Sequence, residues 1–215
     1  ELEIIQMLVK RNARVDVVNR GDMTPLDIAA QAEYFDIGLF LLSQGAQIRK
    51  QSQHMLYTAI HNGNIDVIKL LEDVGIGLDT PDDYEGETPL FDCIGTNSVD
   101  VARYLIEKGA NVNHTTEHGK TPLHNAVEHG EFDLVQLLVE RNARVNMVND
   151  GYTPLDIALE CNRVEMCLYL LSHGAQVKAK KLTKNIENIF SKWNPVSYQQ
   201  EMYRMRQAMP DNITS

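Results

Sequence analysis

The tripeptide Thr-Pro-Leu occurs four times in this chain, starting at Thr24, Thr88, Thr121 and Thr153. The last three copies lie close to 33 residues apart. A fixed period of roughly 20–50 residues is typical of repeat proteins, in which each unit stacks on its neighbours. This period constrains the fold most, because one unit cannot bury its apolar face alone and the chain must form an extended array.

The residue types within each period indicate two helices. Threonine is a preferred N-cap, and the proline after it fits the first helical position, where its missing N–H costs nothing. A first helix is expected to end near Gly130, and a second one follows with apolar residues at helical spacing. Glycine in the left-handed conformation then stops the second helix, as at Gly45, Gly109 and Gly174. The residues expected to face inward are Leu123, Ala126, Val127, Phe132, Val135, Leu137 and Leu138.

Two further motifs accompany the period: Thr-Pro-Leu-His-Asn-Ala at 121–126 and Lys-Gly-Ala-Asn-Val-Asn at 108–113. Together they resemble the ankyrin-repeat family. The resemblance covers residues 1–177 and implies an all-α solenoid of antiparallel helix pairs with short β-hairpin fingers. One partial repeat would precede five full ones, as part of a longer array. We expect residues 178–215 to form a C-terminal helical cap or tail.

Two irregularities modify this pattern. The second full repeat has His54-Met55-Leu56 in place of Thr-Pro-Leu, and the segment before it, 49–53, is short. We therefore expect a helix pair from His54 to Gly75 without a projecting hairpin before it. In addition, the sequence of 11–15 recurs at 141–145. This offset of about four repeats favours duplication of a block, and the alternative is convergence on the family pattern.

The charge balance limits the class of partner. Residues 1–177 hold 13 Lys/Arg and 27 Asp/Glu, which argues against nucleic acid, since phosphate binding needs basic residues. No apolar run approaches the ~18 residues of a membrane span. Cys93, Cys161 and Cys167 fall where a small apolar residue fits, so we expect reduced, buried thiols and a cytoplasmic and/or nuclear protein.

The resemblance places the recognition surface on the finger tips and on the exposed face of the first helices. On the helices, the implied positions are Gln31, His61, Asn62, Thr96, Glu128, His129, Glu160 and Cys161. The finger at 79–87 stands out because it carries five acidic residues and a tyrosine. We interpret it as part of an acidic groove for a basic or extended segment of another protein, with Tyr84, Phe91 and Tyr152 as aromatic anchors.

The alternative is a solvated charged surface that keeps the array soluble. The candidate partner-binding residues are Asp82, Asp83, Tyr84, Glu85, Glu87, Asp92, Glu117, His118, Glu128, His129, Tyr152 and Glu160.

Other chemistry finds little support in the sequence. His114 and His118 have a ligand-like spacing, but it falls on a hairpin, and no closed tetrahedral ligand set accompanies it. The family resemblance implies that His124 bonds to neighbouring backbone. No nucleophile elbow and no glycine-rich phosphate loop are present. We therefore expect no catalytic residue, no metal, no cofactor and no small-molecule substrate.

Two asparagines suggest a modification. Leu105 precedes Asn113 by eight residues, and Leu138 precedes Asn146 likewise. This spacing resembles the sites of the asparaginyl hydroxylase that modifies ankyrin repeats. The favoured alternative is that both are ordinary turn asparagines of the repeat.

The tail has a different pattern. Ile186, Ile189 and Phe190 lie on one face of an expected helix from Lys181 to Trp193. It is interpreted as a cap on the last repeat, and the alternative is a partner-binding or membrane-surface helix. The leading function is a non-catalytic protein–protein interaction module, a scaffold or adaptor. The alternatives are the substrate-recruiting domain of a larger enzyme, such as a ubiquitin ligase or methyltransferase, and an effector or inhibitor that mimics cellular ankyrin proteins.

Overall fold

The computed structural model describes residues 1–49, 54–73, 75–82 and 85–176. Over these ranges the regular structure is helical, apart from an isolated antiparallel bridge between Asn149 and Tyr152. The helices are α1 (Leu2–Lys10), α2 (Pro25–Gln31), α3 (Phe35–Ser43), α4 (His54–His61), α5 (Ile65–Asp73), α6 (Pro89–Gly95), α7 (Val99–Glu107), α8 (Pro122–His129), α9 (Phe132–Glu140), α10 (Pro154–Glu160) and α11 (Val164–Ser172).

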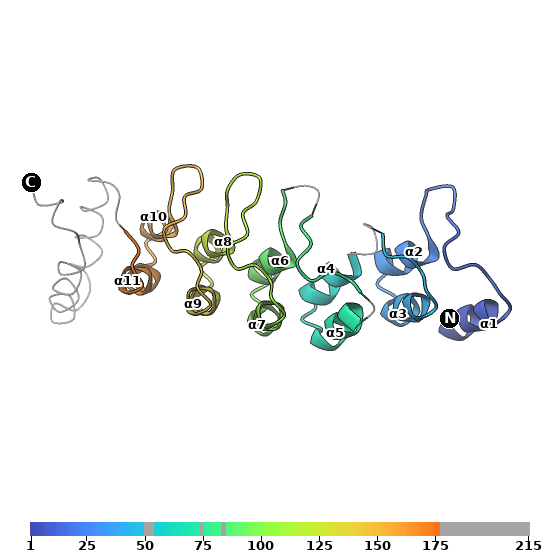
Figure 1. Cartoon of the computed structure of the whole chain (residues 1–215). Coiled ribbons are helices and arrows are strands. Elements are labelled where there is room, and N and C mark those ends of the chain that lie inside the picture. Colours follow the sequence, from blue (N-terminus) through green and yellow to red (C-terminus); the bar gives the residue numbers. More distant parts are fainter. Residues whose placement is uncertain (50–53, 74, 83–84, 177–215) are drawn as a thin grey trace, which may run out of the picture.

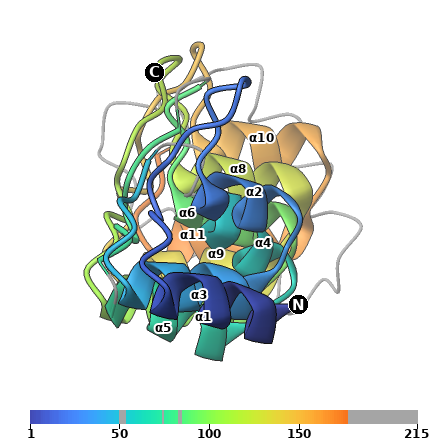
Figure 2. The ribbon, with the colours of Figure 1, turned by 90° about the vertical axis from the view of Figure 1, so that its right-hand side faces the viewer.

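The helices stack in two rows (Figure 1). The inner row contains α2, α4, α6, α8 and α10, and the outer row contains α1 and the partner of each inner helix. Each inner helix packs on the following outer helix and on the next inner one. Finger loops precede α2, α6, α8 and α10, and they lean to one side of both rows (Figures 1 and 2). The predicted all-α solenoid of helix pairs is confirmed.

The Thr-Pro pairs begin four inner helices, as predicted. At Thr24, Thr121 and Thr153 the hydroxyl accepts the N–H of the third helical residue, whose side chain accepts the threonine N–H in return. Thr88 also caps its helix, but its buried hydroxyl finds no hydrogen-bond partner in the described part of the chain. The N–H of Phe91, the third residue of α6, donates instead to the Thr88 carbonyl at 2.8 Å, and the Phe91 side chain has no acceptor for the Thr88 N–H.

The glycines end the second helices as expected. Gly45, Gly109 and Gly174 have φ of +86°, +97° and +86°, in the region that only glycine adopts without strain. The core runs through the array without a break. Its members include six of the seven residues predicted to face inward, and Phe132 is partly buried beside them.

Helix α1 has no inner-row helix beside it within the described ranges. Its residues Ile4, Met7 and Leu8 are 61%, 49% and 52% exposed. They correspond to residues 134, 137 and 138 of α9, which are at most 2% exposed. The same apolar pattern is therefore buried in α9 and open to solvent in α1.

A forward turn bridge links successive outer turns. In it, a side-chain oxygen of one turn accepts the N–H of a residue in the next turn, over 2.7–3.3 Å. Asn113 and Asn146 also donate through Nδ2 to a carbonyl of that next turn, at 3.1 and 2.9 Å. These bonds give both asparagines a structural role, which agrees with the favoured interpretation of them as turn asparagines of the repeat. The bridging residues are Asp16, Asp79, Asn113 and Asn146.

Arg49 occupies the corresponding position after α3. Its guanidinium instead reaches back, to the Asp22 carboxylate at 2.8 Å and to the buried Asp27 carboxylate at 3.5 Å. This junction therefore contains an ion pair directed toward the preceding finger.

Several predictions have mixed outcomes. The helix pair that begins at His54 is confirmed, but the shortened hairpin before it falls on residues 50–53 and the cap on 178–215, both outside the described residues. Cys93 and Cys167 are buried as predicted. The prediction for Cys161 is wrong, because this residue follows the last turn of α10 and is exposed.

Candidate functional site

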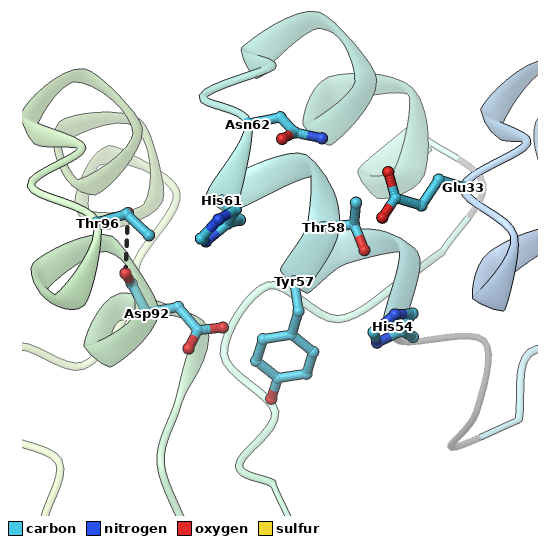
Figure 3. A pocket seen from close by; sticks show the side chains of 8 residues that line it. All are labelled: Glu33, His54, Tyr57, Thr58, His61, Asn62, Asp92 and Thr96. Atoms are coloured by element: carbon cyan, nitrogen blue, oxygen red, sulfur yellow. Dashed lines mark hydrogen bonds between the residues drawn. The ribbon is translucent and has the colours of Figure 1, made fainter.

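A groove of about 340 Å³ crosses the inner row at α4 (Figure 3). One end is formed by the turn between α2 and α3, and the other by α6. Acidic, imidazole, hydroxyl and amide groups occur along its walls, between apolar parts of the same side chains. Its lining residues are Glu33, His54, Tyr57, Thr58, His61, Asn62, Asp92 and Thr96.

The groove depends on the irregular start of α4. Tyr57 occupies the position that holds the capping partner Asp27, His124 or Asp156 in other repeats. Its aromatic ring lies along the wall of the groove (Figure 3). Sequence reasoning identified the irregular tripeptide but missed Glu33, His54, Tyr57 and Thr58 as groove residues. The signal that could have found them was this replacement of the capping partner by tyrosine.

Asp92 is the acidic group within the groove. It lies on α6, where α2 and α10 have Ile28 and Ile157, and it is directed toward α4 between His61 and Tyr57 (Figure 3). The carboxylate is half-buried. Among the described residues it takes part in no hydrogen bond and no ion pair, so its negative charge is not compensated locally.

The electrostatics of Asp92 follow from this position. Burial, and then the charges of the nearby Glu87 and Asp82, raise its pKa to about 6, while His61 opposes the shift. Asp92 is therefore mainly anionic at neutral pH, although burial and its neighbours make that charge unfavourable. A cation placed in the groove would relieve both effects.

Asp82 has a structural task in the finger before α6. One of its carboxylate oxygens accepts the N–H groups of Glu85, Gly86 and Glu87, over 2.9–3.1 Å. It therefore shapes the acidic finger. Glu87 is half-buried, and burial, then the charge of Glu85, raises its pKa.

Neighbouring fingers are connected in register. The Glu117 N–H donates to the Glu85 carbonyl at 3.0 Å, and the His114 Nε2 lies 2.7 Å from the Gly86 carbonyl oxygen. Glu85, Glu117 and His118 are exposed on these two fingers. The structure thus brings the predicted finger acids together, beside the groove that contains Asp92.

Other predicted residues lie apart or are already engaged. Glu128 pairs with Lys120 at 2.8 Å, and this lysine lowers the Glu128 pKa. His129 bonds the carbonyl of its own helix through Nδ1 at 3.0 Å. Tyr152 is exposed in the finger before α10, and Glu160 is exposed at the end of α10, which lies away from α4 (Figure 1). Asp83 and Tyr84 lie outside the described residues.

Phe91 corrects the predicted aromatic anchors. It is 1% exposed and contacts the His114 ring edge-on, with centroids 6.3 Å apart. As the third residue of α6 it points into the interior between helix and finger. Phe91 is therefore a core residue and not an anchor for a partner.

The described histidines form no metal centre. No group of three or more His, Cys, Asp or Glu side chains there could hold a metal ion. His124 is buried and links its N-cap Thr121 to the backbone carbonyls of Met147 and Tyr152, at 3.1 and 3.2 Å. The predicted bonding of His124 to neighbouring backbone is confirmed. Burial lowers its pKa. Within the same ranges, no helix has the length and apolar content to cross a membrane.

Comparison with protein families agrees with this architecture. A family model for ankyrin repeats in three copies matches residues 48–116 and 111–181, more than half of the chain. The chain belongs to the ankyrin-repeat family. Ankyrin repeats bind other proteins and are typically non-catalytic.

Curated relatives share parts of this ankyrin array. The yeast (Saccharomyces cerevisiae) protein named Probable 26S proteasome regulatory subunit p28 is 32% identical over 113 residues, which are 50% of this chain and 49% of that protein. The fowlpox virus ankyrin repeat protein FPV031 is 29% identical over 179 residues, 80% of this chain and 44% of the viral one. Human protein phosphatase 1 regulatory subunit 27 is 30% identical over 115 residues, 52% of this chain and 71% of the human protein. The chain thus spans about half the length of the yeast and viral relatives.

Proposed function

We propose that this ankyrin array is a non-catalytic scaffold or adaptor that binds a basic, extended segment of another protein. The segment lies along the inner-row groove and the acidic fingers before α6 and α8. The protein acts in the cytoplasm, the nucleus or both. The observation that supports this proposal best is the uncompensated carboxylate of Asp92 in the groove.

The surrounding charge points the same way. Glu33 lines the groove, and Glu85, Glu87 and Glu117 lie on the adjacent fingers. The whole chain has a formal net charge of −10. Such a field accelerates the encounter with a cationic segment, and close carboxylates pair with guanidinium or ammonium groups. Names of relatives that contain "regulatory subunit" agree with a binding role.

A selection experiment tests the chemistry of the partner. The full chain is immobilised and used to select from a displayed library of random peptides of about twelve residues. We expect the selected peptides to be rich in Lys and Arg and to dissociate faster as salt rises, because exposed charge pairs are screened over about 10 Å at 0.1 M. Enrichment of acidic or wholly apolar peptides would contradict the proposal.

Charge reversal then locates the surface. Glu85→Lys with Glu117→Lys should slow association of a selected peptide and reduce its salt dependence. The matched control places two lysines on the outer row, Glu107→Lys with Glu140→Lys, where the last turns of α7 and α9 tolerate cations. Equal effects of the two double variants would show that only net charge matters.

A second candidate function is an effector or inhibitor that mimics cellular ankyrin proteins. The match to fowlpox FPV031 over 80% of the chain favours it. Displacement of a cellular ankyrin protein from its own ligand by this chain, at comparable concentrations, would support this candidate over a scaffold.

A further inference from the structure

One inner helix lacks a long side chain where the others have one. Seven residues after the first residue of the repeat's tripeptide, α2, α4, α8 and α10 have Gln31, His61, Glu128 and Glu160. Helix α6 has Gly95 there. Because Gly95 lies three residues after Asp92, both occupy the same helix face. The missing side chain leaves open space at Gly95, on the helix face that also carries Asp92.

Backbone conformation does not explain this glycine. Gly95 is absent from the residues with positive φ, so an L-residue would fit its backbone. A Cβ added at this position would meet no atom within 4 Å. Gly95 thus lowers helix propensity without a conformational or packing need, and it leaves open space on the face of α6 that carries Asp92. We call Gly95 and Asp92, with the space between them, the α6 notch.

The charged and titratable groups around Asp92 are mostly acidic. Glu33 lies at the far end of the groove, Asp82 and Glu87 approach from the finger, and His54, His61 and the Tyr57 phenol come from α4. Lys120, whose charge acts on Glu87, is itself paired with Glu128 at 2.8 Å. The described residues therefore supply no cation to Asp92.

We propose that the α6 notch accepts one lysine or arginine side chain of the partner segment, with its aliphatic stem along the Tyr57 ring and its charged end at Asp92. This inference rests on the proposed function and adds to it the single position that recognises a basic residue of the partner. The groove is at the small end of the range for ligand sites, which suits one long side chain. An ammonium or guanidinium group there replaces water at the half-buried carboxylate with a charge-assisted hydrogen bond.

Binding at the notch depends on pH in one direction. The pKa of Asp92 is about 6 in the free protein, so below that pH a proton competes with the cation. The affinity of the notch for the cationic side chain therefore falls as pH drops below about 6. In Asp92→Asn, the part of this pH dependence that is due to the carboxylate should be lost.

The direct test needs no variant. The isotope-labelled full chain is titrated with Nα-acetyl-lysine methylamide and Nα-acetyl-arginine methylamide, and with the uncharged norleucine analogue as control. Nuclear magnetic resonance follows the Asp92 carboxyl carbon and the Gly95 amide. We expect both cationic probes to shift these two signals and the norleucine analogue to leave them in place. Shifts confined to other acidic residues, or none at all, would overturn the notch.

Variants then measure its contribution to a selected basic peptide. Asp92→Asn, which keeps the side-chain shape, and Gly95→Gln, which fills the notch without changing charge, should each weaken binding about tenfold, as expected for loss of a hydrogen bond to a charged group. Glu107→Gln makes the same charge change as Asp92→Asn on the outer row and should alter affinity less than about twofold. Thermal unfolding checks that each variant is folded.

The outcomes separate the two proposals. If basic peptides bind through the fingers but Asp92→Asn behaves like Glu107→Gln, the notch is wrong and the proposed function stands. If no basic peptide is selected, the proposed function fails, and the lysine and arginine probes still report on the notch alone.

Discussion

Asn113 allows a direct measurement of the coupling between repeats. Its Oδ1 accepts the Arg144 N–H at 2.7 Å, and its Nδ2 donates to the Asn142 carbonyl at 3.1 Å. Both bonds join one outer turn to the next and both are at the surface. Replacing Asn113 with alanine removes them together and leaves the core unchanged.

The magnitude follows from exposure. Each net hydrogen bond contributes about 0.5–1 kcal/mol at an exposed site, and water can satisfy the released groups, so no burial penalty is added. Asn113→Ala should therefore lower the free energy of unfolding by about 1–2 kcal/mol. For an array of this length, that corresponds to a fall in Tm of about 2–8 °C. Asn113→Asp keeps the acceptor, as Asp79 does naturally toward the Asn111 N–H, and should lose about half as much.

The assay combines urea unfolding followed by circular dichroism with hydrogen exchange of the Arg144 amide. Exchange of that amide should accelerate in Asn113→Ala and remain close to the parent rate in Asn113→Asp. An alanine variant that unfolds at the parent temperature, with unchanged exchange at Arg144, would refute the view that turn bridges couple the repeats.

Three other changes test the electrostatics and capping. Asp92→Asn should raise the free energy of unfolding at pH 7 by no more than about 2 kcal/mol, after allowance for solvent screening. The pKa of Asp92 is about 6 in the folded protein, above its ordinary 3.8, so the parent protein is destabilised as pH rises from about 4 to 6. Urea titrations at low and neutral pH should therefore show that the stability advantage of Asp92→Asn disappears near pH 4. Burial lowers the pKa of His124 below its ordinary 6.5, so the unfolded state binds more protons and the parent protein should lose stability as pH falls below 6.5. The urea midpoint of His124→Gln should therefore depend less on pH than that of the parent protein. An equal pH dependence of the two midpoints would contradict the lowered pKa of His124. Asp156→Ala should lower the free energy of unfolding, measured by chemical denaturation, by about 1–2 kcal/mol. The reason is that the Asp156 carboxylate accepts hydrogen bonds from the Thr153 N–H at 2.8 Å and from the Thr153 hydroxyl at 2.7 Å. Asp156→Asn retains an acceptor and should lower the free energy of unfolding less.

The helices could be predicted from the sequence because their signals are local. A threonine N-cap, a proline at the first helical position and a left-handed glycine act within one turn, and all of them recur at the observed boundaries. The repeat period supplies the stacking, since each unit must bury the same apolar positions. The architecture therefore needs no information from distant residues.

The groove could not be predicted in the same way. Glu33, Tyr57 and Asp92 become neighbours only when three successive repeats are stacked. Phe91 was mistaken for an anchor because an aromatic residue beside an acidic finger suggests binding, whereas its helical position directs it inward. The pairing of Glu128 with Lys120 depends on how a finger folds back over its helix, which the sequence pattern does not specify.

Arg49 gives one junction of the stack a different response to ionic strength. The asparagine bridges are neutral amide contacts, which salt barely screens, but the Arg49–Asp22 pair at 2.8 Å lies at the surface, where added ions weaken it. In a solenoid each repeat contacts only its neighbours, so weakening one contact reduces the cooperativity of unfolding at that place in the array. Because Asp22 and Asp27 both lie before α3 and Arg49 directly follows it, concentrated salt should loosen the finger before α2 from the turn after α3.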